Sequence, residues 1–307
     1  MVTHMRRKHA MGRSRSDIIF DSIRFILLTL ATLLVAYPRY CVVISSFSDP
    51  VAVASGKVTF LPIGFTLEGY ERVLQEQRVM RGFANSLLYT VVGVLVNLVV
   101  TIPTSYALSR KDFFGQKPIT IYYMVTMFIG GGLIPTYLVV SQTGLMDTMW
   151  ALVIPGALGV YNMIVGRTFF VTNIPDELLE ASKLDGCGNT RFFLYIVLPL
   201  SGAIIAILTL YYGIGHWNSY FSALLYITNR AKWPLQLELR SILLQNQWSQ
   251  TSQVMTAEQL AEKARLEALT EMMKYSLIII STIPMLILYP FIQKYFVKGV
   301  MIGAVKG

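Results

Sequence analysis

The chain has 307 residues, of which 54% are hydrophobic and 14% are charged, and its formal net charge is +9. A water-soluble domain carries about 25% charged residues, so this composition argues against an ordinary soluble enzyme or binding domain and indicates the lipid bilayer as solvent. The two cysteines, Cys41 and Cys187, are too few for a disulfide framework, and the three histidines lack the spacing of metal ligands.

The N-terminal segment, residues 1–17, is a basic tail. The apolar run that follows it, 25–44, is about 20 residues long, which is enough to cross the ~30 Å hydrocarbon core. The apolar region of a secretory signal is shorter, at about 7 to 15 residues, so we expect a first transmembrane helix rather than a cleaved signal. Basic residues beside a span are explained by membrane orientation, and we expect no nucleic-acid partner.

Five more apolar runs follow, and each is long enough to cross the bilayer. Because a chain in lipid must satisfy its own backbone hydrogen bonds, we expect all of them to be helical. Prolines inside the runs should kink the helices rather than end them. The six predicted spans are 25–44, 84–108, 119–140, 150–171, 200–227 and 275–297, and the prolines within them are Pro103, Pro135, Pro155 and Pro284. The sequence therefore predicts an all-α integral membrane protein whose membrane domain occupies 18–297.

The distribution of charge predicts the orientation. With the N-terminus inside, the inner segments carry 15 basic and seven acidic residues, a balance of +8, which leaves +1 of the total of +9 for the outer segments. Lys and Arg favour the cytoplasmic side, so both termini, including a short C-terminal tail at 298–307, are expected in the cytosol. The outer segments are then 45–82 and 228–274, and the second should contain a solvated helix from Ala257 to Met273.

A hydrophilic segment at 172–199 lies between the fourth and fifth spans and is expected on the cytosolic side. Pro175 suits the first position of a short helix, and Gly186 suits the left-handed conformation that closes one. A second short helix, capped by Asn189, should end before Pro199. Glu180 and Leu184 share a face of the first helix, and the small residues Ala181 and Ser182 would let another surface approach. With Asp185, these residues predict a loop that docks against a partner.

The fifth span is rich in aromatic and amide side chains, a combination that suits sugars. Aromatic faces stack on the C–H surfaces of sugars, and amides bond their hydroxyl groups. The candidates for a substrate path are Asn162 in the fourth span and Tyr212, Trp217, Asn218 and Tyr220 in the fifth. The competing interpretation is structural, because Trp and Tyr gather at membrane interfaces and Asn can join helices.

No motif for chemistry of its own is present. A phosphate-binding loop needs GxxxxGK followed by Ser or Thr, and Gly56-Lys57 lacks the rest of that pattern. The spans contain no GxSxG or HExxH motif and no acid–base pair, which disfavours a membrane-embedded enzyme. We expect no catalytic residue, cofactor or metal in the chain.

Several motifs resemble those of one transporter family. The docking loop, with Glu180, Ala181, Ser182, Gly186 and Pro199, resembles the EAA loop of bacterial ABC importer permeases, although Ser182 replaces the second alanine. The wider resemblance is to the carbohydrate-uptake branch and its lipo-oligosaccharide and aldouronate-type permeases, relatives of the maltose permease subunits. Its motifs are SFSDP (46–50), FLPIGFTLEGY (60–70), GGGLIPTYLVV (130–140), Tyr161-Asn162, RTFF (167–170) and YPFIQKYFVKGVMIGAVKG (289–307).

The resemblance implies a type I ABC importer permease fold in the bacterial cytoplasmic membrane. The expected partners are a second, homologous permease, two ATPase subunits that hold ATP and Mg²⁺, and an extracytoplasmic solute-binding protein. The expected function is ATP-driven import of an oligosaccharide by alternating access, with a non-sugar solute as the alternative. Arg39, where relatives carry an apolar residue, is expected to reach the outer interface.

Overall fold

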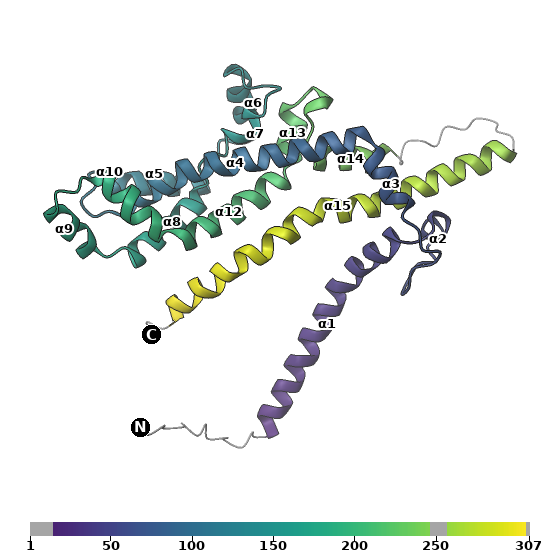
Figure 1. The fold of residues 1–307 in the computed structure, drawn as a ribbon, viewed down its shortest axis with the longest axis horizontal. Helices are drawn as coiled ribbons and strands as arrows, with labels where there is room; N and C mark the ends of the chain where they lie inside the picture. The colour runs from purple at the N-terminus through teal and green to yellow at the C-terminus, as the bar shows by residue number, and fades with distance from the viewer. Residues whose placement is uncertain (1–14, 246–256, 305–307) are drawn as a thin grey trace.

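The structure, a computed structural model, describes residues 15–245 and 257–304, and every regular element in this part of the chain is a helix (Figure 1). The predicted all-α class is therefore confirmed. In chain order the elements are α1 (Arg15–Ser46), α2 (Pro50–Ala54), α3 (Glu68–Gln75), α4 (Gln77–Ser109), α5 (Gln116–Phe128), α6 (Leu133–Gln142), α7 (Trp150–Val153), α8 (Val160–Asn173), α9 (Asp176–Leu184), α10 (Asn189–Phe192), a π-helical turn (Phe193–Val197), α11 (Leu198–Leu200), α12 (Gly202–Trp217), α13 (Phe221–Tyr226), a 3-10 turn (Arg230–Lys232), α14 (Leu235–Gln245) and α15 (Ala257–Ala304).

Helix α4 is the centre of the fold, and it packs most extensively against α12 and α8. Small residues allow this close approach. A Cβ added to Gly93 of α4 would lie 2.5 Å from Nε2 of His216 on α12, and one added to Gly166 of α8 would lie 2.7 Å from Oγ of Ser105. Backbones that approach this closely gain dispersion contacts, which is how apolar helices associate in lipid.

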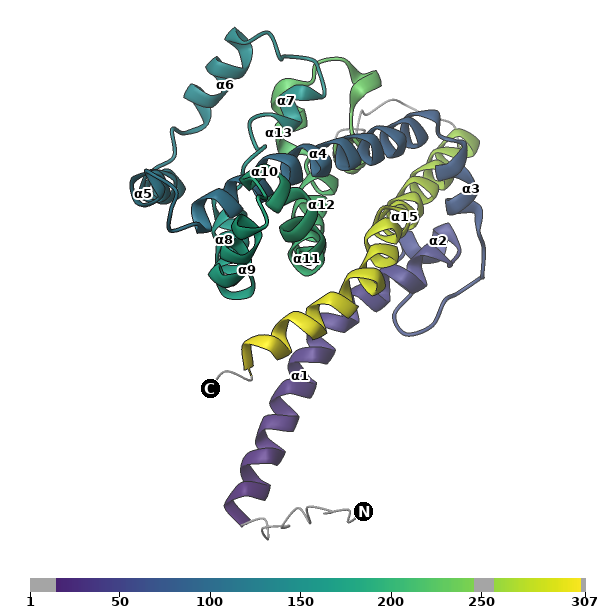
Figure 2. The ribbon, with the colours of Figure 1, turned by 60° about the vertical axis from the view of Figure 1, so that its left-hand side comes forward.

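Helices α1 and α15 form a second group that lies beside the first (Figure 2). They pack against each other, and α2 and α3 pack against α15. The most apolar stretch of α1 has no buried residue, and leucines such as Leu27, Leu30 and Leu34 are exposed along it. This surface is therefore available to lipid or to another membrane subunit. Arg39 is also exposed on α1 and donates a hydrogen bond to the Val35 carbonyl of its own helix.

Three helices, α1, α4 and α15, contain a stretch long and apolar enough to cross a membrane unaided, and the number rises to five if each bent helix pair is one span. The third predicted span consists of α5 and α6, which meet at 113°. The glycine run at 130–132 forms this bend, and Gly132 has φ +85°, a conformation that only glycine adopts readily. The expected kink is present but is much sharper than a proline kink, so Pro135 is not its cause.

The fourth and fifth predicted spans are also interrupted. Residues 154–159, which include Pro155, separate α7 from α8, so Pro155 lies at a break instead of a kink. Residues 218–220 separate α12 from α13. By contrast, α4 continues through Pro103 and α15 continues through Pro284, as expected. The prediction that these three spans are unbroken was wrong, because a hydropathy average over about 20 residues does not register an interruption of a few residues.

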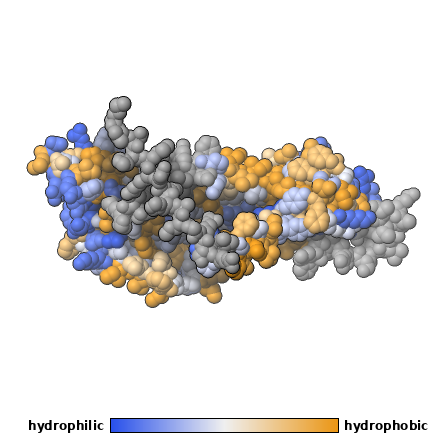
Figure 3. Space-filling view, turned by 90° about the horizontal axis from the view of Figure 1, so that it is seen from below, coloured by the Kyte–Doolittle hydropathy of each residue, from blue (hydrophilic) through white to orange (hydrophobic). Residues whose placement is uncertain are grey.

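The predicted outer helix Ala257–Met273 and the predicted sixth span are one helix, α15. The predicted C-terminal tail boundary at 298 also falls inside α15, and the N-terminal tail lies largely outside the described residues. Figure 3 shows hydrophilic residues gathered at the left-hand end of the molecule, where Figure 1 places α9 and α10. Hydrophobic residues cover much of the described surface beyond that end, which is the pattern of a membrane-spanning chain.

Candidate functional site

Helix α9 has the boundaries of a short docking helix. Pro175 is its N-cap rather than its first residue, so the predicted start was one position early. Asp176 follows it in the first turn, where a carboxylate meets the positive end of the helix dipole. Gly186 has φ +72° and donates its N–H to the Lys183 carbonyl, and the next N–H, from Cys187, returns to Ser182. This is the left-handed closure expected of Gly186.

The two faces of α9 differ in character. Leu179 and Ser182 are buried, and the Ser182 hydroxyl donates to the Leu179 carbonyl at 2.8 Å. Glu180 and Ala181 are exposed, and Leu184 is 89% exposed. Of the two small residues expected to face another surface, only Ala181 is exposed, because Ser182 packs inward. Asp185 and Gly186 lie exposed at the end of the helix.

After the turn at Gly186, the chain forms one bent helical segment. It runs through α10, the π-helical turn and α11 to Leu200, so the prediction that it ends before Pro199 was wrong. Pro199 has no N–H to donate and its ring crowds the carbonyl of the preceding turn, and the wider π-helical turn directly before it accommodates that ring. This helical segment then meets α12 at an angle of 77°.

An apolar cluster joins α9 to the membrane helices. Leu179 of α9 and Phe192 of α10 are buried in the same cluster as Phe170 of α8 and Ile204 of α12. Tightly packed interiors move as units because they deform little. Helix α9 therefore shares one packed apolar cluster with α8 and α12.

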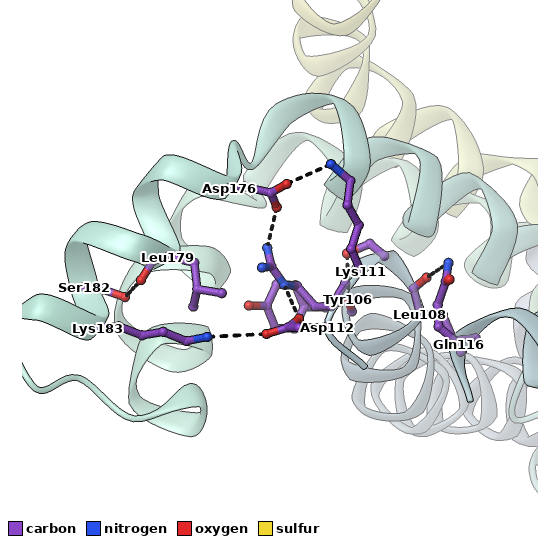
Figure 4. A network of polar contacts seen from close by, with 11 residues as sticks. Tyr106, Leu108, Lys111, Asp112, Gln116, Asp176, Leu179, Ser182 and Lys183 are labelled. Carbon is purple, nitrogen blue, oxygen red and sulfur yellow. Dashed lines mark hydrogen bonds and ion pairs between the residues drawn. The ribbon is translucent and has the colours of Figure 1, made fainter. Parts of the chain in front are cut away.

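Ion pairs hold α9 against the loop that follows α4 (Figure 4). Asp176 accepts from Lys111 at 2.9 Å and from Arg110 at 3.2 Å, and Lys183 reaches Asp112 at 3.4 Å. The hydrogen bond from Lys111, together with the charge of Arg110, holds the pKa of Asp176 below its usual value. Exposed pairs of this kind each contribute about 0 to 1 kcal/mol, so the network orients the two segments more than it stabilises them.

The same two segments enclose a cavity of about 230 Å³. Its wall combines Tyr106 at the end of α4, Phe113 and Phe114 in the loop, Leu179 of α9 and Asn189 of α10. Phe114 is 98% exposed. The sequence alone did not indicate this loop, because its contacts with α9 join residues more than 60 positions apart.

Two of the residues expected to contact substrate, Trp217 and Tyr212, are buried and hydrogen-bonded to neighbouring helices. Trp217 is 1% exposed, donates its indole N–H to the Ser281 carbonyl of α15 at 2.9 Å, and meets Phe83 of α4 edge-on. The Tyr212 hydroxyl bonds Thr101 at 2.7 Å and accepts the Gly159 N–H at 3.1 Å. These contacts favour the structural interpretation of both aromatic residues.

The other three candidates are at least partly open. Asn162 is half-buried on α8. Asn218 is exposed beyond the end of α12 and donates to the Ile214 carbonyl of its own helix. Tyr220 is 37% exposed, and the Arg240 guanidinium lies 4.8 Å from the centre of its ring.

A buried polar pair that the sequence analysis did not single out fixes the break in the fourth span. Asn97 of α4 is fully buried and donates to the carbonyls of Gly156 and Ala157 at 2.7 and 2.9 Å. Its amide oxygen lies 2.6 Å from Nε2 of His216. The detectable signal was a lone amide within an apolar run, since such a residue rarely faces lipid. Among the described residues, no group of His, Cys, Asp and Glu could hold a metal ion.

Comparison with known proteins places these features in context. Residues 79–302 match the family described as "Binding-protein-dependent transport system inner membrane component". The chain is 36% identical over 289 residues to the polygalacturonan/rhamnogalacturonan transport system permease protein YtcP of Bacillus subtilis (strain 168), covering 94% of this chain and 99% of that one. It is 35% identical to the protein LplC of the same organism, covering 97% and 99%.

A solved structure is also similar. It is described as the crystal structure of a bacterial ABC transporter involved in the import of the acidic polysaccharide alginate. The TM-score is 0.82 at 31% sequence identity, and the match covers 92% of this chain and 98% of that one. At this identity and coverage, the likeness extends over the whole arrangement of helices described above.

Proposed function

Because the chain belongs to the family of binding-protein-dependent transport system inner membrane components, we propose that it is the membrane subunit through which an ATP-driven importer moves an oligosaccharide. The permease assignment follows from the family, and the membrane helices agree with it. The carbohydrate assignment is supported by relatives whose names refer to the transport of polysaccharides or their fragments. Import of a non-sugar solute is the alternative.

The observation that carries the proposal is the connection from α9 to the membrane core. The helix presents Glu180, Ala181 and Leu184 outward while Leu179 packs with Phe170 and Phe192. A hydrophilic helix with one exposed face and one buried face is suited to bind a partner and to transmit the partner's movement to the helices it packs against. We propose that the segment 172–199 is the EAA loop and that a separate ATPase subunit binds its exposed face.

Coupling through this contact requires two states of the assembly. ATP binding would draw two ATPase subunits together, and α9 would carry that movement to α8 and α12 through the shared apolar cluster. A ligand shifts such an equilibrium only by the difference in its affinity for the two states, so the two arrangements of the permease must differ at the ATPase contact. The membrane subunits would then open alternately to the two sides of the membrane. In this scheme the present chain transmits the movement, and the ATPase subunits hydrolyse ATP.

The remaining assignments complete the proposal. The chain would cross the bacterial cytoplasmic membrane six times: α1, α4, α15 and the two bent pairs supply five crossings, and α7 with α8, in the predicted span 150–171, would supply the sixth. Both termini would lie in the cytosol. A homologous second permease would cover part of the exposed apolar surface, and an extracytoplasmic solute-binding protein would deliver the sugar. Of the five residues named as candidates for the substrate path, Asn162, Asn218 and Tyr220 remain accessible enough to meet a ligand.

The test is reconstituted transport. The chain would be purified with the permease, ATPase and binding-protein subunits that assemble with it, and the purified assembly would be placed in liposomes. We expect uptake of labelled oligosaccharide that requires both ATP and the binding protein. Assembly and ATP hydrolysis with uptake of amino acids or ions, and not of any sugar, would contradict the carbohydrate assignment and leave the permease assignment intact.

A further inference from the structure

The segment 218–245, which the proposed orientation places toward the outer side of the membrane, contains three basic residues, and one of them has no carboxylate partner among the described residues. Arg230 forms a two-pronged pair with the buried Glu238 at 3.0 and 3.1 Å, and Lys232 pairs with Asp147 at 3.1 Å. Arg240 is exposed and has no ion-pair partner among the described residues. Its guanidinium instead lies over the ring of Tyr220. Within the described part of the chain, the charge of Arg240 is therefore held against Tyr220 and not paired with a carboxylate.

We infer that Arg240 and Tyr220 form a recognition site for a carboxylate-bearing sugar, which makes the transported oligosaccharide an acidic one. This inference rests on the proposed transport function and deepens it. The Arg240 guanidinium carbon lies 4.8 Å from the centre of the Tyr220 ring, and a guanidinium over an aromatic ring can still direct N–H groups at the two oxygens of a carboxylate. Tyr220 is 37% exposed, so the exposed part of its ring offers a stacking surface for the C–H face of the same sugar residue.

The position of Arg240 and Tyr220 is consistent with the entrance of the substrate path. Tyr220 follows the last residue of α12 by three positions, and Arg240 lies on α14. Figure 1 shows α13 and α14 far from α9, the helix proposed to bind the ATPase. A ligand that meets Arg240 therefore arrives from the side opposite the ATPase, where a binding protein would release it. The exposed amide of Asn218 lies nearby in sequence and is suited to bond a hydroxyl group.

The rigidity of the pair adds to its selectivity. An exposed arginine samples many rotamers, and ordering it costs free energy when a ligand binds. Stacking on Tyr220 restricts those rotamers before the ligand arrives, so less is lost on binding. Arg240→Lys keeps the charge but loses the planar fork, and it should therefore recover only part of the recognition.

The experiment compares acidic and neutral sugars in the reconstituted assembly at saturating binding protein. Trigalacturonate and maltotriose are the probes, and the variants are Arg240→Gln, Arg240→Lys and Lys57→Gln, the last being an exposed outer cation that serves as the control. We expect Arg240→Gln to raise the half-saturating concentration of trigalacturonate about tenfold, since hydrogen bonds to charged groups are the strong ones. Maltotriose uptake, where present, and both activities of Lys57→Gln should change less than about twofold.

Other results would contradict either the acidic-sugar site or the proposed transport function, and they can be told apart. Equal losses for both sugars in Arg240→Gln would overturn the inference, because they indicate a structural role or a contact with the binding protein. A loss seen in anionic lipid but absent in pure phosphatidylcholine would also overturn it, because Arg240 would then bind lipid phosphate. Uptake of maltotriose but not trigalacturonate by the wild type would overturn the acidic assignment while leaving the proposed function standing. Absence of sugar uptake in an assembled, ATP-hydrolysing wild type would count against the proposed function itself.

Discussion

Nζ of Lys111 lies 2.9 Å from Oδ2 of Asp176, and this contact joins two segments that are 65 positions apart in the chain. One is the loop that closes the end of α4, the central helix of the fold, and the other is the first turn of α9. The contact therefore links the most heavily packed membrane helix to the helix proposed to receive the ATPase. Several consequences of this arrangement can be measured.

The first prediction concerns the protonation of Asp176. Its pKa is held below the usual value by Lys111 and Arg110, so Lys111→Met should raise it. The measurement is an NMR titration of carboxyl-labelled aspartate in detergent. Lys117→Met, which removes an exposed cation on α5 with no ion pair among the described residues, is the control and should leave the midpoint unchanged. An identical midpoint in wild type and Lys111→Met would contradict the contact.

The sign of the pH effect follows from the direction of that shift. A carboxyl group whose pKa is lower in the folded state contributes stability at pH values above its unfolded pKa, about 3.9 for Asp. That contribution is lost as the pH falls through the lowered folded-state pKa. The attachment of α9 should therefore be constant from neutral pH down to about pH 4 and should weaken only in stronger acid. A spin-label distance between positions 114 and 184 would report the change.

The second prediction concerns Gly186. Its φ of +72° penalises any β-carbon, although nothing lies within 4 Å of where that atom would be. Gly186→Ala should cost about 1 to 2 kcal/mol in the closure of α9, with reduced uptake per assembled complex. Gly188→Ala is the matched control, because Gly188 has φ −75° and is equally unobstructed. Equal uptake by the two variants would show that the left-handed turn is not required.

The third prediction assigns a structural role to Trp217. Trp217→Phe removes the hydrogen bond to the Ser281 carbonyl and should cost about 1 kcal/mol, whereas Trp217→Ala should cost about 3 to 5 kcal/mol. Thermal unfolding in detergent measures both changes, and Trp150→Phe, at a half-exposed position, is the control. Uptake per assembled complex should be retained in Trp217→Phe. A normal unfolding temperature with lost uptake would restore Trp217 to the substrate path.

Sequence reasoning predicted much of the architecture and part of the site. The helical class, the start of α9 to within one residue and the left-handed Gly186 follow from local rules that concern single turns and helix ends. The break at 154–159 does not, because it depends on a partner from another helix. Asn97 shows the reason: its amide satisfies the carbonyls of Gly156 and Ala157 from about 60 positions away, and hydropathy cannot anticipate that. The contacts of Trp217 are also long-range: its indole N–H reaches the Ser281 carbonyl 64 positions away, so the sequence left both its substrate-path and its structural interpretations open.

The fourth prediction tests that role of Asn97. Asn97→Leu would leave the carbonyls of Gly156 and Ala157 and the His216 ring without their partner, at about 1 to 3 kcal/mol for each group that water does not reach. Asn218→Leu makes the same chemical change at an exposed amide that bonds only its own helix, so it should change stability by less than about 1 kcal/mol. Thermal unfolding of the two variants should therefore differ clearly. Equal unfolding temperatures would mean that the break at 154–159 does not depend on Asn97.

The central claim, that the exposed face of α9 binds the ATPase, is tested most directly by photo-crosslinking in the assembled transporter. A photoreactive phenylalanine analogue would replace Leu184, which is 89% exposed on α9, and in a second sample Leu34, which is 72% exposed on the membrane helix α1. We predict a covalent adduct with the ATPase subunit from position 184 and none from position 34. An assembled complex that hydrolyses ATP and yields no ATPase adduct from position 184, or equal adducts from both positions, would contradict the account.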